Sequence, residues 1–203
     1  MDILISFVLA VSLLAISPGP DNIFVLMQSV VHGKKYGIST IAGLMSGCLV
    51  HTTFVAFGVS TIIKENNTIF LVIKLLGAIY LCFLSYSVFK SDATITMTTQ
   101  NIQKKTPFQL FKMGFMMNVL NPKVTIFFLA LFPGFLFSNE LSTVVQFYVL
   151  GGVFILVSFV IFSTIALLGG SISERIKQNK QIGIWLKWMQ IIVFIGIALF
   201  ILI

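Results

Sequence analysis

The stretch "SPGPDN", residues 17–22, interrupts what would otherwise be one long apolar helix near the start of the chain. Uncharged residues run from 3 to 16 before it and from 23 to 31 after it. Proline breaks helices because it lacks an amide donor and its ring collides with the preceding turn. The sequence therefore puts a helix break and a carboxylate, Asp21, inside an apolar segment, and both need an explanation.

The composition indicates that most of the chain lies in a lipid bilayer. Of its 203 residues, 58% are hydrophobic and 9% are charged, whereas an average soluble domain has about 25% charged residues. The net charge is +7, but the lysines lie between apolar runs and form no basic face, so we expect no nucleic-acid partner. The lipid bilayer is the expected surrounding of this protein.

The hydropathy pattern predicts an all-α, polytopic membrane protein with six transmembrane helices. The predicted spans are Ile3–Val31, Ile38–Ile63, Ile69–Phe89, Phe108–Phe137, Val144–Leu168 and Ile184–Ile203. Basic residues concentrate in the first, third and fifth connections, and basic connections stay in the cytoplasm. Both termini are therefore predicted to lie outside.

The first and fourth spans are longer than the ~20 residues that cross a bilayer, and each is interrupted near its middle. The helix breaks are Pro18, Gly19 and Pro20 in the first span and Pro122 in the fourth. Paired interrupted helices are typical of transporters built from inverted repeats. We expect a 3+3 inverted repeat in one membrane domain, with a first half at 1–95, a cytoplasmic connecting loop at 96–107 and a second half at 108–203.

The two breaks predict a binding site for a zwitterion. A helix that restarts after a break exposes free amides, which suit a carboxylate, while the carbonyl end of the preceding half-helix suits an ammonium group. Asp21 follows the first break and Lys123 the second, and a charge at mid-bilayer costs ~2.5–3.5 kcal/mol. We expect one shared site in which Asp21 serves the ammonium or a coupling proton and Lys123 the carboxylate. Direct pairing of the two side chains without substrate is a further hypothesis.

Polar neighbours of the breaks are candidates for the same site. Asn22 adjoins Asp21, and Asn118, Asn121 and Thr125 recur at helical spacing in the fourth span. These side chains either contact the substrate or satisfy the broken backbone, and the sequence leaves both roles open.

The second span carries His51 one turn beyond Gly43 and Gly47, which form a small-residue surface for close helix packing. An intramembrane imidazole is either a proton relay or a hydrogen-bonded packing residue, and both roles stay open. Cys48 and Cys82 have no C-x-x-C or zinc spacing, so we interpret them as small buried residues. We expect neither a metal nor a cofactor.

Two long segments, "SPGPDNIFVLMQSVVHGKKYGISTIAGLMSGCLVH" from Ser17 and "FKMGFMMNVLNPKVTIFFLALFPGF" from Phe111, resemble the LysE/RhtB family of bacterial amino-acid exporters. The resemblance covers essentially the whole chain, and P-G-P-D together with N-P-K is its specific part. It implies a secondary transporter, not an enzyme, that exports amino acids across the cytoplasmic membrane with an ion gradient, for which we expect protons. N-P-K followed by aromatic residues is closer to the homoserine/threonine branch, which implies a neutral, homoserine-like or threonine-like substrate.

Other functions remain as alternatives. A transmembrane thiol/disulfide electron carrier of related fold needs paired cysteines at the broken helices, where this chain has Asp21 and Lys123. A passive amino-acid channel stays open. An intramembrane enzyme is not favoured, because no H-E-x-x-H or G-x-S-x-G motif is present. The sequence also leaves the oligomeric state open, a homodimer included.

Overall fold

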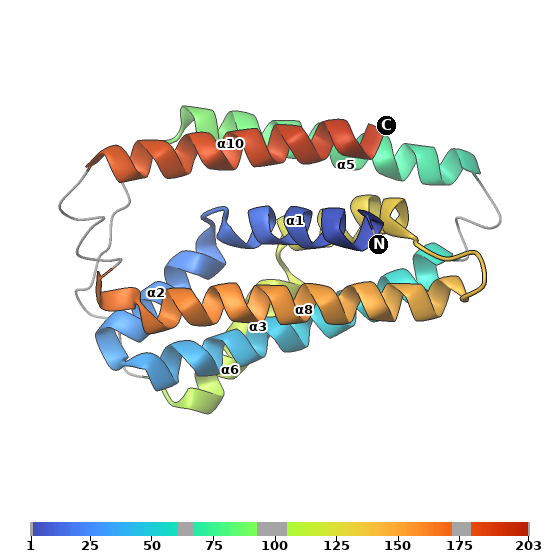
Figure 1. The fold of residues 1–203 in the computed structure, drawn as a ribbon. Helices are drawn as coiled ribbons and strands as arrows, with labels where there is room; N and C mark the ends of the chain where they lie inside the picture. The colour runs from blue at the N-terminus through green and yellow to red at the C-terminus, as the bar shows by residue number, and fades with distance from the viewer. Residues whose placement is uncertain (1, 61–66, 93–104, 172–179, 203) are drawn as a thin grey trace.

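The computed structural model describes residues 2–60, 67–92, 105–171 and 180–202, and its long helices run along one common direction (Figure 1). The elements are α1 (Asp2–Ile16), α2 (Pro20–His32), α3 (Lys34–Phe54), η1 (Val55–Val59), α5 (Asn67–Lys90), α6 (Pro107–Val119), α7 (Pro122–Ile126), η2 (Phe127–Leu131), η3 (Phe132–Phe135), α8 (Thr143–Leu167) and α10 (Lys180–Leu202). Most of the predicted connecting loop at 96–107, and most of the basic fifth connection, lie outside the described residues.

The helices have the length and composition of membrane spans. Among the described residues, four helices are long and apolar enough to cross a membrane, and the number becomes six when each bent helix pair is one span. The chain is a polytopic, all-α membrane protein, as its hydropathy predicts. The two termini lie at the same end of the molecule in Figure 1, as an even number of crossings requires.

Both predicted breaks are present. α1 and α2 meet at 61° across Ser17–Gly19, and α6 meets the segment Pro122–Phe135 at 49°. Proline at the first position of α2 and of α7 accounts for both bends, because the preceding helix cannot continue through it. Each half-helix therefore ends or begins inside the apolar part of the molecule.

The helices form two groups. α5 packs mainly against α10, and the pair lies at one edge of the molecule in Figure 1. α3 packs most extensively against α6, while α8 covers α1, α2 and α3. α1 and the η2–η3 segment lie between the two groups (Figure 1). The third spans of the two predicted halves, α5 and α10, are thus neighbours, and the inverted repeat itself stays a prediction.

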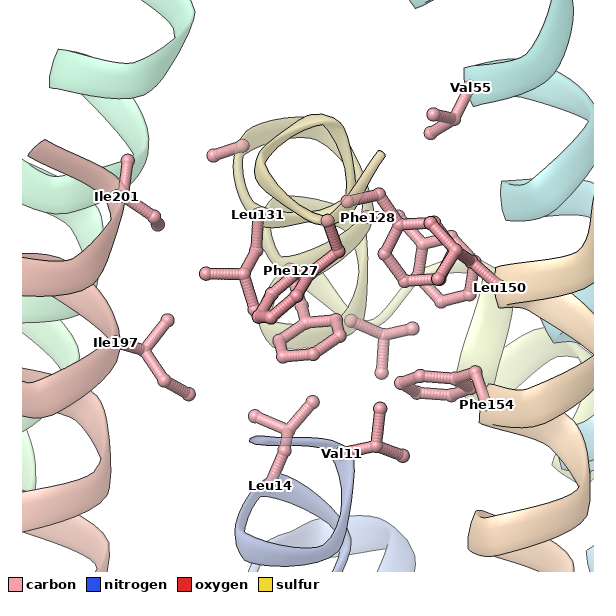
Figure 2. Close-up of a cluster of buried hydrophobic side chains, with 14 of the residues drawn as sticks. Val11, Leu14, Val55, Phe127, Phe128, Leu131, Leu150, Phe154, Ile197 and Ile201 are labelled. Carbon is pink, nitrogen blue, oxygen red and sulfur yellow. The ribbon is translucent and has the colours of Figure 1, made fainter. Parts of the chain in front are cut away.

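An aromatic core fixes the segment that follows the second break (Figure 2). The rings of Phe128 and Phe132 stack at 4.1 Å between centroids, and Phe154 of α8 meets Phe128 edge-on at 4.8 Å. Figure 2 shows Val11 and Leu14 of α1 approaching the same cluster. Such aromatic pairs contribute about 0.5–1.5 kcal/mol beyond the burial of their area. The core therefore holds η2 and η3 firmly against α1 and α8.

Glycines allow α3 and α6 to approach closely. A Cβ atom at Gly43 would collide with the carbonyl oxygen of Phe111, and one at Gly114 would collide with the carbonyl oxygen of Thr40. A Cβ atom at Gly47 would lie 2.7 Å from Asn118 Oδ1. The predicted small-residue surface is confirmed, and its partner is the first half of the broken fourth span.

One prediction about the cysteines is wrong. Cys48 is fully buried in α3, as expected, but Cys82 is exposed on α5. α5 contacts its neighbours along one side only, so its other side, including Cys82, is left for lipid. The mean hydropathy of a span does not distinguish a lipid-facing position from a core position.

Candidate functional site

The first break leaves carbonyl groups that a charged side chain satisfies. Pro18 has no amide hydrogen, so the carbonyl oxygen of Leu14 loses its helical donor. Lys123 Nζ donates to Leu14 O at 3.0 Å and to Ser17 O at 3.2 Å. The ammonium group of the second broken span therefore binds the carbonyl end of α1. Its Nζ also lies 5.4 Å from the ring centroid of Phe194 on α10.

Asn22 provides a hydrogen-bond donor for another carbonyl at the C-terminal end of α1. Its Nδ2 donates to Ala15 O at 2.7 Å, across the bend between the two half-helices. The structure thus assigns Asn22 the backbone-satisfying role that the sequence left open beside ligand contact. Its side chain also lines the cavity described below.

The second break is satisfied by a histidine. Pro122 cannot donate to Asn118 O, which accepts instead from Asn121 N at 3.0 Å and from His51 Nε2 at 3.1 Å. Because a carbonyl oxygen only accepts, the Nε2 atom of His51 carries the hydrogen. The ring is buried, with its centroid 5.4 Å from that of Phe128. These contacts are those of a packing histidine, and a proton-relay role stays a prediction.

The N-terminus of α2 has free amide donors. α2 begins at Pro20 without a side-chain cap, so the amides of Asp21 and Asn22 have no acceptor among the described residues. α7 differs, because Asn121 Oδ1 accepts from Lys123 N at 3.0 Å and caps it. The positive end of a helix dipole is thus available at the first break, where a carboxylate is favourable.

Asn121 joins the two breaks. Its Nδ2 donates to Asp21 Oδ2 at 2.7 Å, while its Oδ1 caps α7. Asp21 is 8% exposed and Lys123 is partly buried. The carboxylate binds Asn121 and the ammonium binds the carbonyls of α1, so the two charges lie at one place without the direct pairing that the sequence suggested.

A small cavity of about 40 Å³ lies where the breaks meet. Of the predicted residues, the first span contributes Gly19, Pro20, Asp21 and Asn22 to its lining, and the fourth span contributes Asn118, Asn121 and Lys123. The cavity has room for about three water molecules, and an amino acid has more heavy atoms than that. A molecule of the size of an amino acid would fit only if these walls moved apart.

The remaining predicted residues lie outside this lining. Pro18 and Pro122 create the breaks, and His51 contacts the cavity only through the backbone of Asn118. Thr125 Oγ1 donates to Asn121 O at 3.0 Å, one turn back in its own helix. Asn121 O also accepts from Thr125 N, so Thr125 makes the ordinary bond of a helical threonine to the carbonyl four residues earlier and does not line the cavity.

Sequence reasoning missed the contributions of α3 and α8. Cys48 lines the cavity, and its Sγ accepts from Asn118 Nδ2 at 3.4 Å, although the sequence placed it away from the breaks. Ser158 of α8 also lines the cavity, between Phe154 and Phe162. In "FILVSFVIF", residues 154–162, this serine is the single polar residue, with a phenylalanine one turn away on each side. That pattern was the available signal.

Two interrupted helices that meet at a charged, buried cavity are the arrangement of multi-pass membrane transport proteins. The chain matches the model of the LysE type translocator over residues 12–203, and it belongs to that family. The resemblance seen in the sequence is thereby confirmed.

Curated relatives are similar over most of their length. A homoserine/homoserine lactone efflux protein of Salmonella typhimurium is 31% identical over 176 residues, which cover 87% of this chain and 84% of the relative. A leucine efflux protein of Klebsiella pneumoniae is 30% identical over 182 residues, which cover 89% and 85%. No solved structure gives a significant match.

Proposed function

We propose that this protein is a secondary active exporter of small neutral amino acids in a bacterial cytoplasmic membrane. Family membership and the relatives named for homoserine and leucine efflux support export of amino acids. One observation of the structure carries the proposal further. A free helix N-terminus, a helix carbonyl end, a carboxylate and an ammonium group all meet at one buried cavity.

The groups at the cavity match the two charged ends of an amino acid. The free amides of Asp21 and Asn22, together with Lys123, suit the α-carboxylate. The carbonyls of Leu14 and Ser17, together with the carboxylate of Asp21, suit the α-ammonium group. Lys123 now donates to those carbonyls, so a substrate ammonium group would take its place and release Lys123 toward the substrate carboxylate. Because Lys123 now links the second break to the end of α1, its displacement by the substrate would allow the second break to move relative to the first.

Asp21 is the proposed coupling acid. Its carboxylate accepts from Asn121, which also caps α7, so Asp21 is linked directly to the second broken span. A proton on Asp21 removes the charge that strengthens this hydrogen bond and weakens the attachment of α7 to α2. Proton occupancy and the separation of the cavity walls are thereby coupled in the proposed mechanism.

Vesicles that contain the purified protein test the proposal. With a pH gradient imposed, homoserine, threonine or leucine should accumulate beyond equal concentrations on the two sides. A passive channel would only equalise the concentrations, and that result would overturn secondary active export. A protein that moves none of these amino acids under any gradient would contradict amino-acid export altogether.

The thiol/disulfide alternative has its own test. Cys82 is a free thiol on the exposed side of α5 and does not line the cavity. A dithiol carrier needs both cysteines, so Cys82→Ala would end electron transfer. Amino-acid export should persist in Cys82→Ala, whereas an electron carrier would transfer thiol/disulfide equivalents across the membrane in wild type and lose that activity in this variant.

A further inference from the structure

The hydroxyl group of Ser158 is buried at the cavity without a partner. Ser158 is 1% exposed, and its Oγ has no hydrogen-bond partner among the described residues. The residue lines the cavity at the two breaks. A buried polar group without a partner is costly, so each such group in a native fold calls for an explanation.

Most helical hydroxyls whose bonds the structure describes follow a different pattern, although Ser17, Ser29 and Ser163 also have a buried Oγ without a partner. Ser12 Oγ donates to Val8 O at 2.7 Å, and Thr164 Oγ1, also on α8, donates to Val160 O at 2.9 Å. This bond to the carbonyl four residues earlier is the ordinary arrangement for a serine or threonine in an apolar helix. Ser158 does not make it, so its hydroxyl is available to a group inside the cavity.

We propose that Ser158 determines substrate specificity by hydrogen bonding to a hydroxyl group on the substrate side chain, which rests on the proposed amino-acid export. The charged ends of the substrate are already assigned to α1, α2 and Lys123, and α8 supplies none of those groups. Met45, Phe154 and Phe162 line the same cavity with apolar side chains, and the two phenylalanines lie one helical turn on each side of Ser158. A short aliphatic side chain with one hydroxyl group fits both features, since the chain contacts the apolar walls and the hydroxyl pairs with Ser158.

The chemistry of a hydroxyl pair favours this class of substrate over an apolar one. A hydroxyl group both donates and accepts, so it pairs with the serine hydroxyl in either direction. An aliphatic side chain of the same length would leave Ser158 unpaired, and sites that contain a buried polar group discriminate against ligands that leave it unpaired. The preference should therefore depend on a single atom of the protein, Ser158 Oγ.

Homoserine and 2-aminobutyrate test the proposal, because they differ by one hydroxyl group. We expect the wild-type protein in vesicles to prefer homoserine and Ser158→Ala to lower the homoserine-to-2-aminobutyrate export ratio about tenfold, the effect of one lost hydrogen bond. Export of 2-aminobutyrate itself should persist in this variant. Ser158→Thr keeps the hydroxyl group and should keep the preference.

Ser163→Ala is the matched control. Ser163 is also on α8 with a buried, unpartnered Oγ, but it does not line the cavity, so its removal should leave the ratio unchanged. Thermal unfolding of the purified proteins gives a second measurement, which does not need transport. Homoserine should stabilise wild type and Ser163→Ala more than 2-aminobutyrate does, and this difference should disappear in Ser158→Ala.

The outcomes separate this inference from the proposed function. If Ser158→Ala exports both compounds at the wild-type ratio, or shows the wild-type difference in thermal stabilisation, Ser158 is a structural residue and the inference is wrong. If wild type exports neither compound nor any other amino acid, the proposed function fails and this inference fails with it. Equal reduction of both ratios by Ser158→Ala and Ser163→Ala would also overturn it, since packing of α8 would then be the cause.

Discussion

The positive charge of Lys123 is unfavourable at its position in α7 but favourable at the end of α1, which its side chain contacts. It lies in the first turn of α7, where a cation opposes the helix dipole. Its Nζ, however, donates to Leu14 O and Ser17 O at the C-terminal end of α1, where a cation is stabilised. The side chain thus replaces the amide donor that Pro18 lacks, and a charge inside the membrane has a structural reason to be there.

These contacts make the exchange of the two charges, Asp21→Lys with Lys123→Asp, a sharp test. The new carboxylate at 123 would face carbonyl oxygens instead of donors, so we expect a lower melting temperature in detergent and no export. Lys123→Arg is the control, because it keeps a cation with several donors. A doubly substituted protein that melts and exports like wild type would show that the two charges are interchangeable, and the binding roles proposed for them would be wrong.

Asp21→Asn tests the coupling role. Asparagine has nearly the same shape but carries no exchangeable charge, so export should lose its dependence on an imposed pH gradient. Exchange of labelled for unlabelled amino acid between two pools of equal pH should continue, because it needs no net proton movement. Uphill export that still follows the pH gradient in Asp21→Asn would rule out Asp21 as the coupling acid.

At the scale of elements, the contact between α3 and α6 requires glycine on both helices. Gly43 and Gly114 each lie against the backbone of the other helix. Gly43→Ala should lower the free energy of unfolding by about 1–3 kcal/mol, because the helices must move apart. Chemical denaturation in detergent measures this loss.

Gly152 provides the matched control for that prediction. It lies in α8, and a Cβ atom there would meet nothing within 4 Å. Gly152→Ala should leave stability unchanged or raise it by up to about 1 kcal/mol through helix propensity. Equal effects of the two substitutions would contradict the close-packing explanation.

Spans and breaks could be predicted from the sequence because their causes are local. Hydropathy over a window of residues marks a span, and a preceding helix cannot continue through Pro18, Pro20 or Pro122. Side-chain partners could not be predicted, since Lys123 donates to Leu14, 109 positions away in the sequence. The apolar neighbours of Ser158 mark it locally, but that pattern does not show that its hydroxyl lies at the cavity without a partner. The meeting of the two breaks at one cavity could be predicted only from their paired positions and the opposite charges of Asp21 and Lys123.

At the scale of the whole molecule, the orientation in the membrane remains a prediction. The basic connections predict both termini outside, and the termini lie at the same end of the fold (Figure 1). Short tags at residues 1 and 203 should both be labelled in intact cells by reagents that do not cross the membrane. Labelling of either tag only after the membrane is opened would contradict the six-span orientation.

The two-group arrangement is consistent with the proposed inverted repeat. α5 and α10 are the third spans of the predicted halves, and they form one group at the edge of the molecule. The cavity at the two breaks has no lining residue from α5 or α10. Relative movement of the groups would change the environment of Lys123, whose ammonium lies near Phe194 of α10.

The pairing of α5 with α10 has a consequence for the synthesis and membrane insertion of the protein. α5 is complete at Lys90, but its main partner ends at Leu202, roughly 110 residues later. At ribosomal speeds this interval lasts on the order of ten seconds. During that time, the face of α5 that later packs against α10 contacts lipid. A chain truncated before α10 would keep this face of α5 exposed to lipid permanently. We therefore expect membrane quality-control proteases to degrade such a chain.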